Sequence, residues 1–162
     1  MKMSELDKQL LETYEQKQKS WGKLISHLKR QFDTWATAEL ENHGYSDFKM
    51  GYMPLLMNIH PEGITNNELA KKAKVTKQAM SKVVKELVEA GYIRTETHGQ
   101  DKRSSIIYLT TKGKKLVLSA RSKVFDLEKE YEAFVGKKKF EELKEWLTKI
   151  IDYHDDQLDG CL

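Results

Sequence analysis

The stretch from residue 77 to residue 85 carries polar side chains that fall on one side of a helix. They are Lys77, Gln78, Ser81, Lys82 and Lys85. Positions three and four residues apart share a helix face, and Thr76 in front of them is a residue type that caps helix N-termini. Ammonium, amide and hydroxyl groups on one face are the donors that pair with base edges and phosphate oxygens. The pattern therefore indicates nucleic-acid binding.

We expect some of these polar and basic residues to contact bases and others to contact phosphates. We expect base-edge contacts from Lys77, Gln78, Ser81 and Lys82, near the start of the helix that Thr76 opens. Lys85 lies further along the helix and is expected to contact a phosphate instead, a role that we also assign to Lys72, Lys102 and Lys112.

Two short helices must hold this face in place. Thr65 and Glu68 have the spacing of a capping box, so a first helix should start at Thr65. The second helix should run from Thr76 through Ala90 and stop at Gly91, which tolerates the left-handed C-terminal conformation. Its expected core-facing side chains are Ala79, Met80, Val83, Val84, Leu87 and Val88.

After Gly91 the residue types change to those of strands. Residues 92–97 and 106–109 are rich in β-branched and aromatic side chains, and a polar loop with a glycine joins them, which predicts a hairpin. Asp101, Lys102 and Arg103 lie at its tip, where the Asp101 carboxylate could orient the Arg103 guanidinium. We assign Arg103 to the minor groove. A solvated loop with incidental charge is the alternative.

Taken together, these pieces resemble the DNA-binding core of the MarR family of bacterial transcription regulators. The resemblance is carried by Gly63-Ile64-Thr65 with Glu68-Leu69-Ala70, by Thr76 to Gly91, and by Asp101-x-Arg103 followed by Leu109-Thr110-Thr111-Lys112-Gly113. Motif-level similarity covers about residues 54–116, and the flanking helices also fit the family's architecture.

The resemblance implies a mainly α fold with a small β-hairpin wing. A winged helix-turn-helix domain would be flanked by N- and C-terminal dimerisation helices. We divide the single domain of residues 1–162 into an N-terminal dimerisation helix (1–45), a DNA-binding core (46–116) and C-terminal dimerisation helices (117–162). The resemblance also implies an effector pocket between the dimer helices and the winged domain. The residues that could border it are Trp35, His43, Met50 and Met53.

Long apolar stripes flank the core. Tyr14, Trp21, Leu28 and Trp35 recur every seven positions in an expected helix from Tyr14 to Glu41. Further helices should run from Leu116 to Phe134 and, after Gly136, from Phe140 to His154. These stripes exceed what a winged helix can cover, so burial against a second chain is expected. The predicted interface residues are Tyr14, Trp21, Leu28, Phe140, Leu147 and Ile151. For Trp21 and Trp146 we favour core packing alone.

Pro54 is hard to fit into a helix that starts at Ser46. In a helix interior, proline removes a hydrogen bond and clashes with the carbonyl four residues earlier, here that of Met50. Either the helix is kinked between Gly51 and Pro54, or its regular part begins close to Met53.

Bulk properties agree with DNA binding. The formal net charge is only +3, but residues 66–115 carry 12 Lys and Arg against 5 Asp and Glu, whereas the rest of the chain carries 16 against 20. The single cysteine, Cys161, excludes an internal disulfide, and no apolar run suggests a signal or a membrane span, so we expect a cytoplasmic protein. We expect no cofactor, no metal site and no catalysis, because the histidines are scattered and no phosphate-binding loop or nucleophile motif occurs.

The sequence thus predicts a homodimeric, sequence-specific transcription regulator that binds double-stranded DNA at an inverted repeat. The expected mode is that of a repressor that responds to a small aromatic or phenolic effector. The alternatives are a winged-helix module that docks protein or RNA, and a metal-responsive regulator.

Overall fold

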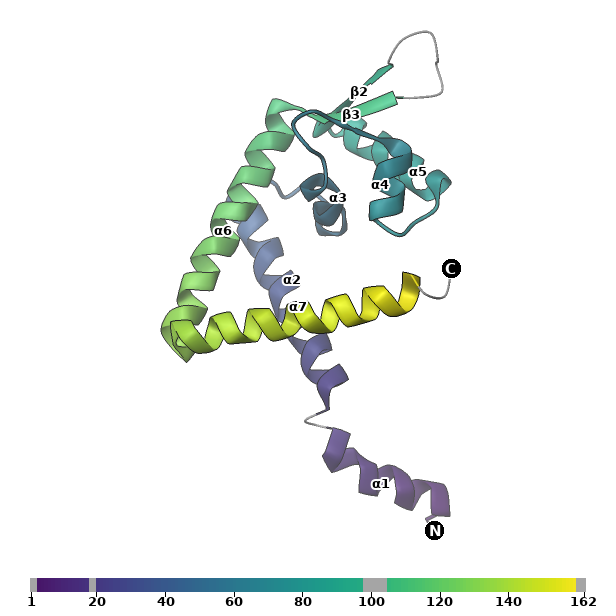
Figure 1. Cartoon of the computed structure of the whole chain (residues 1–162), viewed down its shortest axis with the longest axis vertical. Helices are drawn as coiled ribbons and strands as arrows, with labels where there is room; N and C mark the ends of the chain where they lie inside the picture. The colour runs from purple at the N-terminus through teal and green to yellow at the C-terminus, as the bar shows by residue number, and fades with distance from the viewer. Residues whose placement is uncertain (1–2, 18–19, 98–104, 160–162) are drawn as a thin grey trace. The chain divides into compact units, whose positions relative to one another are not determined.

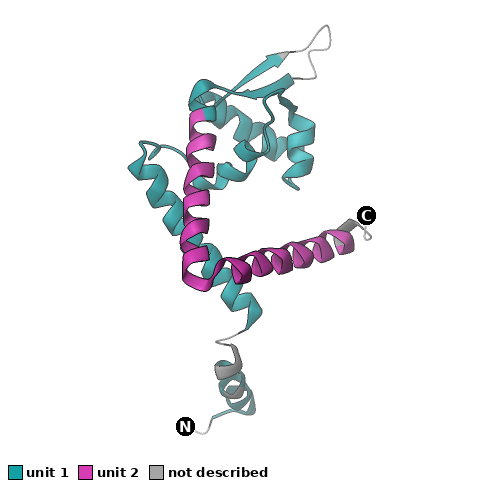
Figure 2. Cartoon of the chain, turned by 60° about the vertical axis from the view of Figure 1, so that its left-hand side comes forward, with its two compact units in different colours: residues 1–114 teal, residues 115–162 magenta. Residues whose placement is uncertain are grey.

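The computed structural model describes residues 3–17, 20–97 and 105–159. It divides into two compact units, residues 1–114 and residues 115–162 (Figure 2). In chain order the elements are α1 (Glu5–Lys17), α2 (Trp21–Asn42), the 3-10 helix η1 (Met50–Tyr52), α3 (Met53–Met57), β1 (Ile64–Thr65), α4 (Asn66–Lys72), α5 (Lys77–Glu89), β2 (Ile93–Thr97), β3 (Ser105–Leu109), α6 (Thr111–Val135) and α7 (Lys137–Asp159) (Figure 1). The mainly helical fold with a small sheet is confirmed.

The N-terminal region contains two helices, so the prediction of one helix from Tyr14 to Glu41 is wrong. Tyr14 belongs to α1, and α2 begins at Trp21 after Ser20, which is extended with φ −66° and ψ 142°. The sequence explains the change, because residues 17–20 contain no apolar side chain and Ser20 is a residue type that favours the position before a helix.

Pro54 lies in the first turn of α3, which begins at Met53 after the three residues of η1. Proline is tolerated in this position, because the N–H that it lacks would have no partner within the helix. Of the two alternatives left by the sequence, the late start is the one that the structure shows.

The helix-turn-helix is confirmed in detail. The Thr65 hydroxyl accepts a hydrogen bond from the Glu68 N–H at 3.2 Å, and a Glu68 carboxylate oxygen accepts from the Thr65 N–H at 2.9 Å. Thr76 caps α5 by accepting from the Ala79 N–H at 3.1 Å. Gly91, with φ +74°, follows the end of α5. Both helices therefore begin at the capping residues that the sequence indicated.

The wing has a third strand that the sequence did not reveal. The sheet order is β1-β3-β2, all antiparallel; Ile64 pairs with Ile107, and Thr95 pairs with Ile107 from the other side. Because β1 has only two residues, it shows no alternation that could predict it. Gly63 leads into it with φ +90°, and a Cβ there would lie 2.4 Å from a methyl carbon of Ile106. Glycine thus allows β1 to approach β3.

The core of the first unit is formed where α3, α4, α5 and the sheet meet. Its fully buried side chains include Leu56, Leu69, Met80, Leu87, Tyr92, Ile93 and Ile107. The core-facing stripe of α5 is narrower than predicted: Met80 and Leu87 are buried, but Ala79 and Val88 are exposed. Val88 instead lines a groove beside the wing.

The second unit contains most of α6 and all of α7. Gly136, with φ +90°, separates the two helices as predicted. Phe140 is buried and its ring centroid lies 5.8 Å from that of Tyr131. Lys144 links the helices through Glu128 at 3.3 Å. Trp146 is 63% exposed and Trp21, in the first unit, is 54% exposed, so the prediction that both are core residues does not hold within one chain.

Candidate nucleic-acid interface

The exposed face of α5 presents the side chains that the sequence singled out. Lys77, Gln78, Lys82 and Lys85 are all exposed there, and Thr76 fixes the start of the helix in front of them. Three ammonium groups and one amide thus lie on a capped helix whose opposite face is held in the core by Met80 and Leu87. This face can enter a major groove with cations and a neutral hydrogen-bonding group side by side.

Ser81 is on the same helix, but its hydroxyl is already engaged. It donates to the Lys77 carbonyl oxygen at 2.8 Å and accepts from the Asn66 side-chain amide at 3.2 Å. With its single proton committed, the hydroxyl retains only acceptor capacity. Asn66 thereby ties the start of α4 to α5, and its own Oδ1 is buried without a partner among the described residues.

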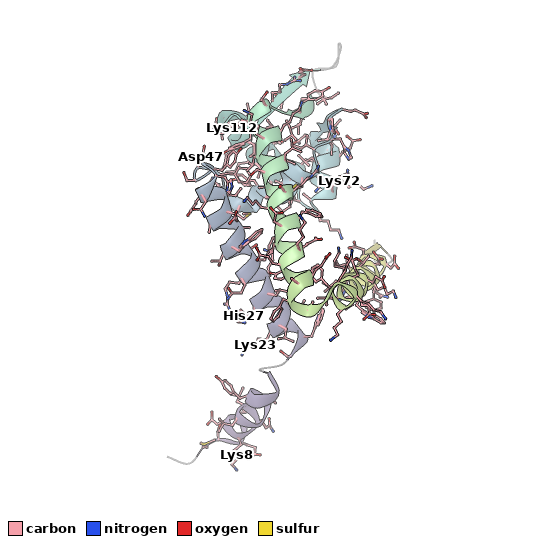
Figure 3. All side chains as sticks on the ribbon, turned by 90° about the vertical axis from the view of Figure 1, so that its left-hand side faces the viewer. Lys8, Lys23, His27, Asp47, Lys72 and Lys112 are labelled. Atoms are coloured by element: carbon pink, nitrogen blue, oxygen red, sulfur yellow. The ribbon has the colours of Figure 1, made fainter. Side chains whose placement is uncertain are left out.

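Lys72 and Lys112, both predicted to contact phosphates, lie in different settings. Lys72 is exposed in the last turn of α4, whereas Lys112 lies beside Asp47 (Figure 3). The Lys112 ammonium is 3.1 Å from both a carboxylate oxygen of Asp47 and the carbonyl oxygen of Ala90, and 4.1 Å from the centroid of the Tyr92 ring. The side chain of Lys112 is thus used within the protein.

Asp47 is the centre of that cluster. The hydroxyl of buried Tyr92 donates to Asp47 at 2.9 Å. This hydrogen bond, together with the one from Lys112, lowers the pKa of Asp47. Burial, followed by the neighbouring carboxylate, raises the pKa of Tyr92, so the phenol stays a donor. The cluster fastens the segment after α2 to the start of β2 and to the first turn of α6.

A second cluster holds α5 on another side. Glu86 accepts hydrogen bonds from Lys49 at 2.5 Å and from Tyr52 at 2.6 Å. The Lys49 hydrogen bond is the main cause that lowers the pKa of Glu86, and the Tyr52 bond adds to it. Sequence reasoning missed both clusters, because Asp47 and Lys49 lie more than 30 residues from their partners and form no periodic pattern with them.

The base of the wing explains the motif Leu109-Thr110-Thr111-Lys112-Gly113. The Thr110 hydroxyl donates to the Gly91 carbonyl oxygen at 2.6 Å and accepts from the Gly113 N–H at 3.1 Å. A Cβ on Gly113 would lie 2.1 Å from the Tyr92 carbonyl oxygen, so only glycine fits. The motif therefore joins the end of α5, the start of β2 and the start of α6.

The tip of the wing, with Asp101, Lys102 and Arg103, lies outside the described residues. On the described strands of the hairpin, Arg94 of β2 pairs with Glu96 and lies 4.6 Å from the centroid of the Tyr108 ring on β3. Arg94 and Tyr108 are cross-strand partners, so the described part of the hairpin is braced by an arginine–aromatic contact.

The residues predicted to border an effector pocket come from adjoining elements. Trp35 is on α2, where its ring centroid lies 5.5 Å from that of Phe32, and His43 caps the end of that helix. Met50 and Met53 begin η1 and α3. All but His43 are half-buried.

In the part of the chain that the structure describes, none of the helices has both the length and the apolar composition that a membrane span requires. Nor do three or more His, Cys, Asp or Glu side chains gather there in a group that could hold a metal ion.

Comparison with known proteins gives a family match over the same core. Residues 46–104 match the model of the MarR family. The HTH-type transcriptional repressor YetL of Bacillus subtilis (strain 168) is 34% identical over 71 residues. That alignment covers 44% of this chain and 42% of YetL, so it spans less than half of the relative's length.

Solved structures extend the similarity to most of the chain. A MarR transcriptional regulator from Methanosarcina mazei Go1 has a TM-score of 0.69 at 25% identity, covering 83% of this chain and 96% of that chain. The S. aureus MepR–DNA complex has a TM-score of 0.67 at 24% identity, covering 83% and 97%. Streptococcus pneumoniae FabT in complex with DNA has a TM-score of 0.69 at 18% identity, covering 85% and 99%. The last two share the fold.

Proposed function

We propose that this protein is a repressor that binds duplex DNA as a homodimer at an inverted repeat. The premise is that the chain belongs to the MarR family of transcription regulators. The observation that carries the proposal is the exposed face of α5, where Lys77, Gln78 and Lys82 lie on a helix anchored by its cap and its buried face. Helices held in this way read base edges in the major groove.

The contacts of Ser81 refine the division of roles. Because its proton is given to the Lys77 carbonyl, Ser81 can only accept a hydrogen bond from a base. Gln78, which has both donor and acceptor groups and no partner among the described residues, is the better reader of a base pair. Lys72 and Lys85 serve the phosphates, and Arg103, at the tip of the wing, remains assigned to the minor groove.

Homodimerisation is supported by apolar side chains that one chain leaves uncovered. The large ones that are more than half exposed include Leu10, Tyr14, Trp21 and Leu28 on α1 and α2, and Leu118, Phe125, Phe134, Trp146 and Ile151 on α6 and α7. Burying such a side chain stabilises an assembly by about 1.5–3 kcal/mol. A second copy of the chain is the partner that the family fold suggests, and two recognition helices would then fit two half-sites.

The proposal includes a small aromatic or phenolic effector. The end of α2 contacts η1, and Trp35, His43, Met50 and Met53 lie on these elements or on adjoining α3. An effector bound there could change the separation of the two recognition helices and with it the affinity for DNA.

The test begins with a footprint of the full-length protein on the DNA upstream of its own gene. Selection from a library of that site with randomised bases then compares wild type, Gln78→Ala and Lys85→Ala. We expect Gln78→Ala to change base preference at one position per half-site. Lys85→Ala should weaken all sequences alike, because phosphate contacts carry no base information. No protected site, together with binding to RNA, would overturn the proposal.

A further inference from the structure

A groove of about 640 Å³ lies between α5 and the wing, within the first unit. Val84 and Val88 of α5 are the apolar residues that line it, and Thr95 and Ser105 of the wing strands line it as well. Asn67 of α4 also lines the groove. The hydrogen bond between Asn66 and Ser81, at 3.2 Å, joins α4 to α5, and both residues line the groove.

The groove differs in charge from the outward face of α5. Its lining includes one lysine and one acidic residue, Lys85 and Glu89, whose charged atoms are 3.9 Å apart. The remaining polar groups are amides and hydroxyls. Those of Asn67, Thr95 and Ser105 come from three different elements, and none has a hydrogen-bond partner among the described residues. The groove thus offers neutral hydrogen-bonding groups together with the apolar side chains of Val84 and Val88.

The geometry of DNA determines what must pass through this space. When a helix occupies the major groove and a hairpin occupies the neighbouring minor groove, one sugar–phosphate strand separates the two. That strand has to run between the helix and the hairpin. In this protein the space between them is the groove that Asn67, Thr95 and Ser105 line.

We propose that this groove seats the sugar–phosphate backbone of one DNA strand in each half-site, and that Asn67, Thr95 and Ser105 donate hydrogen bonds to its phosphate oxygens. The inference rests on the proposed function and adds a set of neutral phosphate contacts to it. The methyl groups of Val84 and Val88 pack on deoxyribose carbons. Lys85, at the edge of the groove, supplies the cationic contact.

Neutral contacts leave a signature that lysine contacts do not. Affinity for DNA falls with salt because each phosphate neutralised by a cation releases counterions. An amide or hydroxyl adds a hydrogen bond but neutralises no charge. Loss of the neutral contacts should therefore weaken binding at every salt concentration by the same factor.

The experiment measures binding of full-length protein to the footprinted duplex by fluorescence anisotropy between about 50 and 200 mM salt. We expect Asn67→Ala/Ser105→Ala to bind about 10- to 100-fold more weakly, at roughly 1 kcal/mol for each hydrogen bond, with an unchanged salt slope. Lys85→Ala should reduce the slope by about one phosphate contact. Asn42→Ala, which removes an exposed asparagine at the end of α2, is the matched control and should bind as wild type.

Phosphate ethylation interference locates the contact. Ethylation of one phosphate per half-site should impair the wild type but have no further effect on Asn67→Ala/Ser105→Ala. Wild-type affinity in this variant, while Gln78→Ala still shifts base preference, would overturn the groove proposal and leave DNA binding intact. Wild-type behaviour of Gln78→Ala and Lys85→Ala as well would count against the proposed function itself.

Discussion

The hydroxyl of Tyr52 lies 2.6 Å from the carboxylate oxygen of Glu86 that also accepts from Lys49. Both donors belong to the region between α2 and α3, and Glu86 belongs to α5. Asp47, in the same connecting segment, holds Tyr92 and Lys112. Contacts from this short segment therefore help to hold α5 in its orientation within the first unit.

Replacing Glu86 by glutamine should lower stability in a pH-dependent way. The hydrogen bonds from Lys49 and Tyr52 lower the pKa of Glu86 in the folded state. The contribution of the carboxylate is therefore complete above its ordinary pKa of about 4.3 and is lost as the pH falls through the lowered value. Urea unfolding at a series of pH values should show a free-energy difference between wild type and Glu86→Gln that is constant near neutrality and shrinks in acid.

Glu62→Gln, at an exposed loop position, is the control for that series and should match wild type at neutral pH. A difference between wild type and Glu86→Gln that stayed the same down to the most acidic pH would show that the charge of Glu86 is not what matters.

Tyr92→Phe should destabilise the fold without opening a cavity. The Tyr92 ring is fully buried, and only its hydroxyl, which donates to Asp47 at 2.9 Å, would be removed. A hydrogen bond to a charged group contributes about 1.5–3 kcal/mol, so we expect a loss on the lower side of that range, because Asp47 retains Lys112. Chemical denaturation measures it. If Asp47→Asn and Tyr92→Phe had fully additive effects, the two groups would not be coupled.

Two glycine-to-alanine substitutions should have opposite effects on stability. At Gly113 the new Cβ would lie 2.1 Å from the backbone oxygen of Tyr92, so α6 and β2 would have to move apart. We expect a loss of about 3 kcal/mol or more, the scale of severe overpacking. At Gly22, in the first turn of α2, nothing lies within 4 Å of the new Cβ, and alanine should stabilise the helix by about 0.5 kcal/mol, the lower end of the range for a mid-helix glycine. Thermal unfolding of both variants and of the wild type measures these changes in stability. A Gly113→Ala variant as stable as the wild type would contradict the close approach of Gly113 to the Tyr92 carbonyl oxygen.

The sequence predicted those parts of the fold that depend on neighbouring residues. Thr65 with Glu68 and Thr76 with Ala79 are caps whose partners are three positions apart, so spacing alone identifies them. Gly91 and Gly136 end helices through their own backbone conformation. The outward position of Gln78 followed from the helical repeat.

What the sequence could not show depends on residues far apart in the chain. The pairing of Ile64 with Ile107 creates β1 from two residues, and the contact between Lys49 and Glu86 spans 37 positions. Lys112 looked like a free phosphate ligand because Asp47, its partner, is 65 residues away. The seven-residue repeat from Tyr14 to Trp35 suggested one helix, because periodicity does not register a local break.

The repeat that crosses this break leads to a prediction about assembly. Tyr14 on α1 and Trp21 and Leu28 on α2 are seven residues apart and more than half exposed. We expect both helices to pack on a second copy, so that Leu10→Ala/Tyr14→Ala weakens the dimer although no residue of α2 is changed. Each truncated side chain loses about 1.5–3 kcal/mol of burial, which raises the dimer dissociation constant at least tenfold.

Sedimentation equilibrium of the full-length protein measures that constant, with Gln9→Ala on the same helix as the control. Because two half-sites must be held at a fixed spacing, DNA affinity should fall with the dimer in the double variant and recover at higher protein concentration. An unchanged dissociation constant would mean that α1 lies outside the interface, whereas a wild-type monomer at micromolar concentration would remove the dimer from the proposed function. A wild-type monomer would, in addition, leave the apolar faces of α2 and α7 uncovered, since the exposed side chains of Trp21 and Trp146 lie on them.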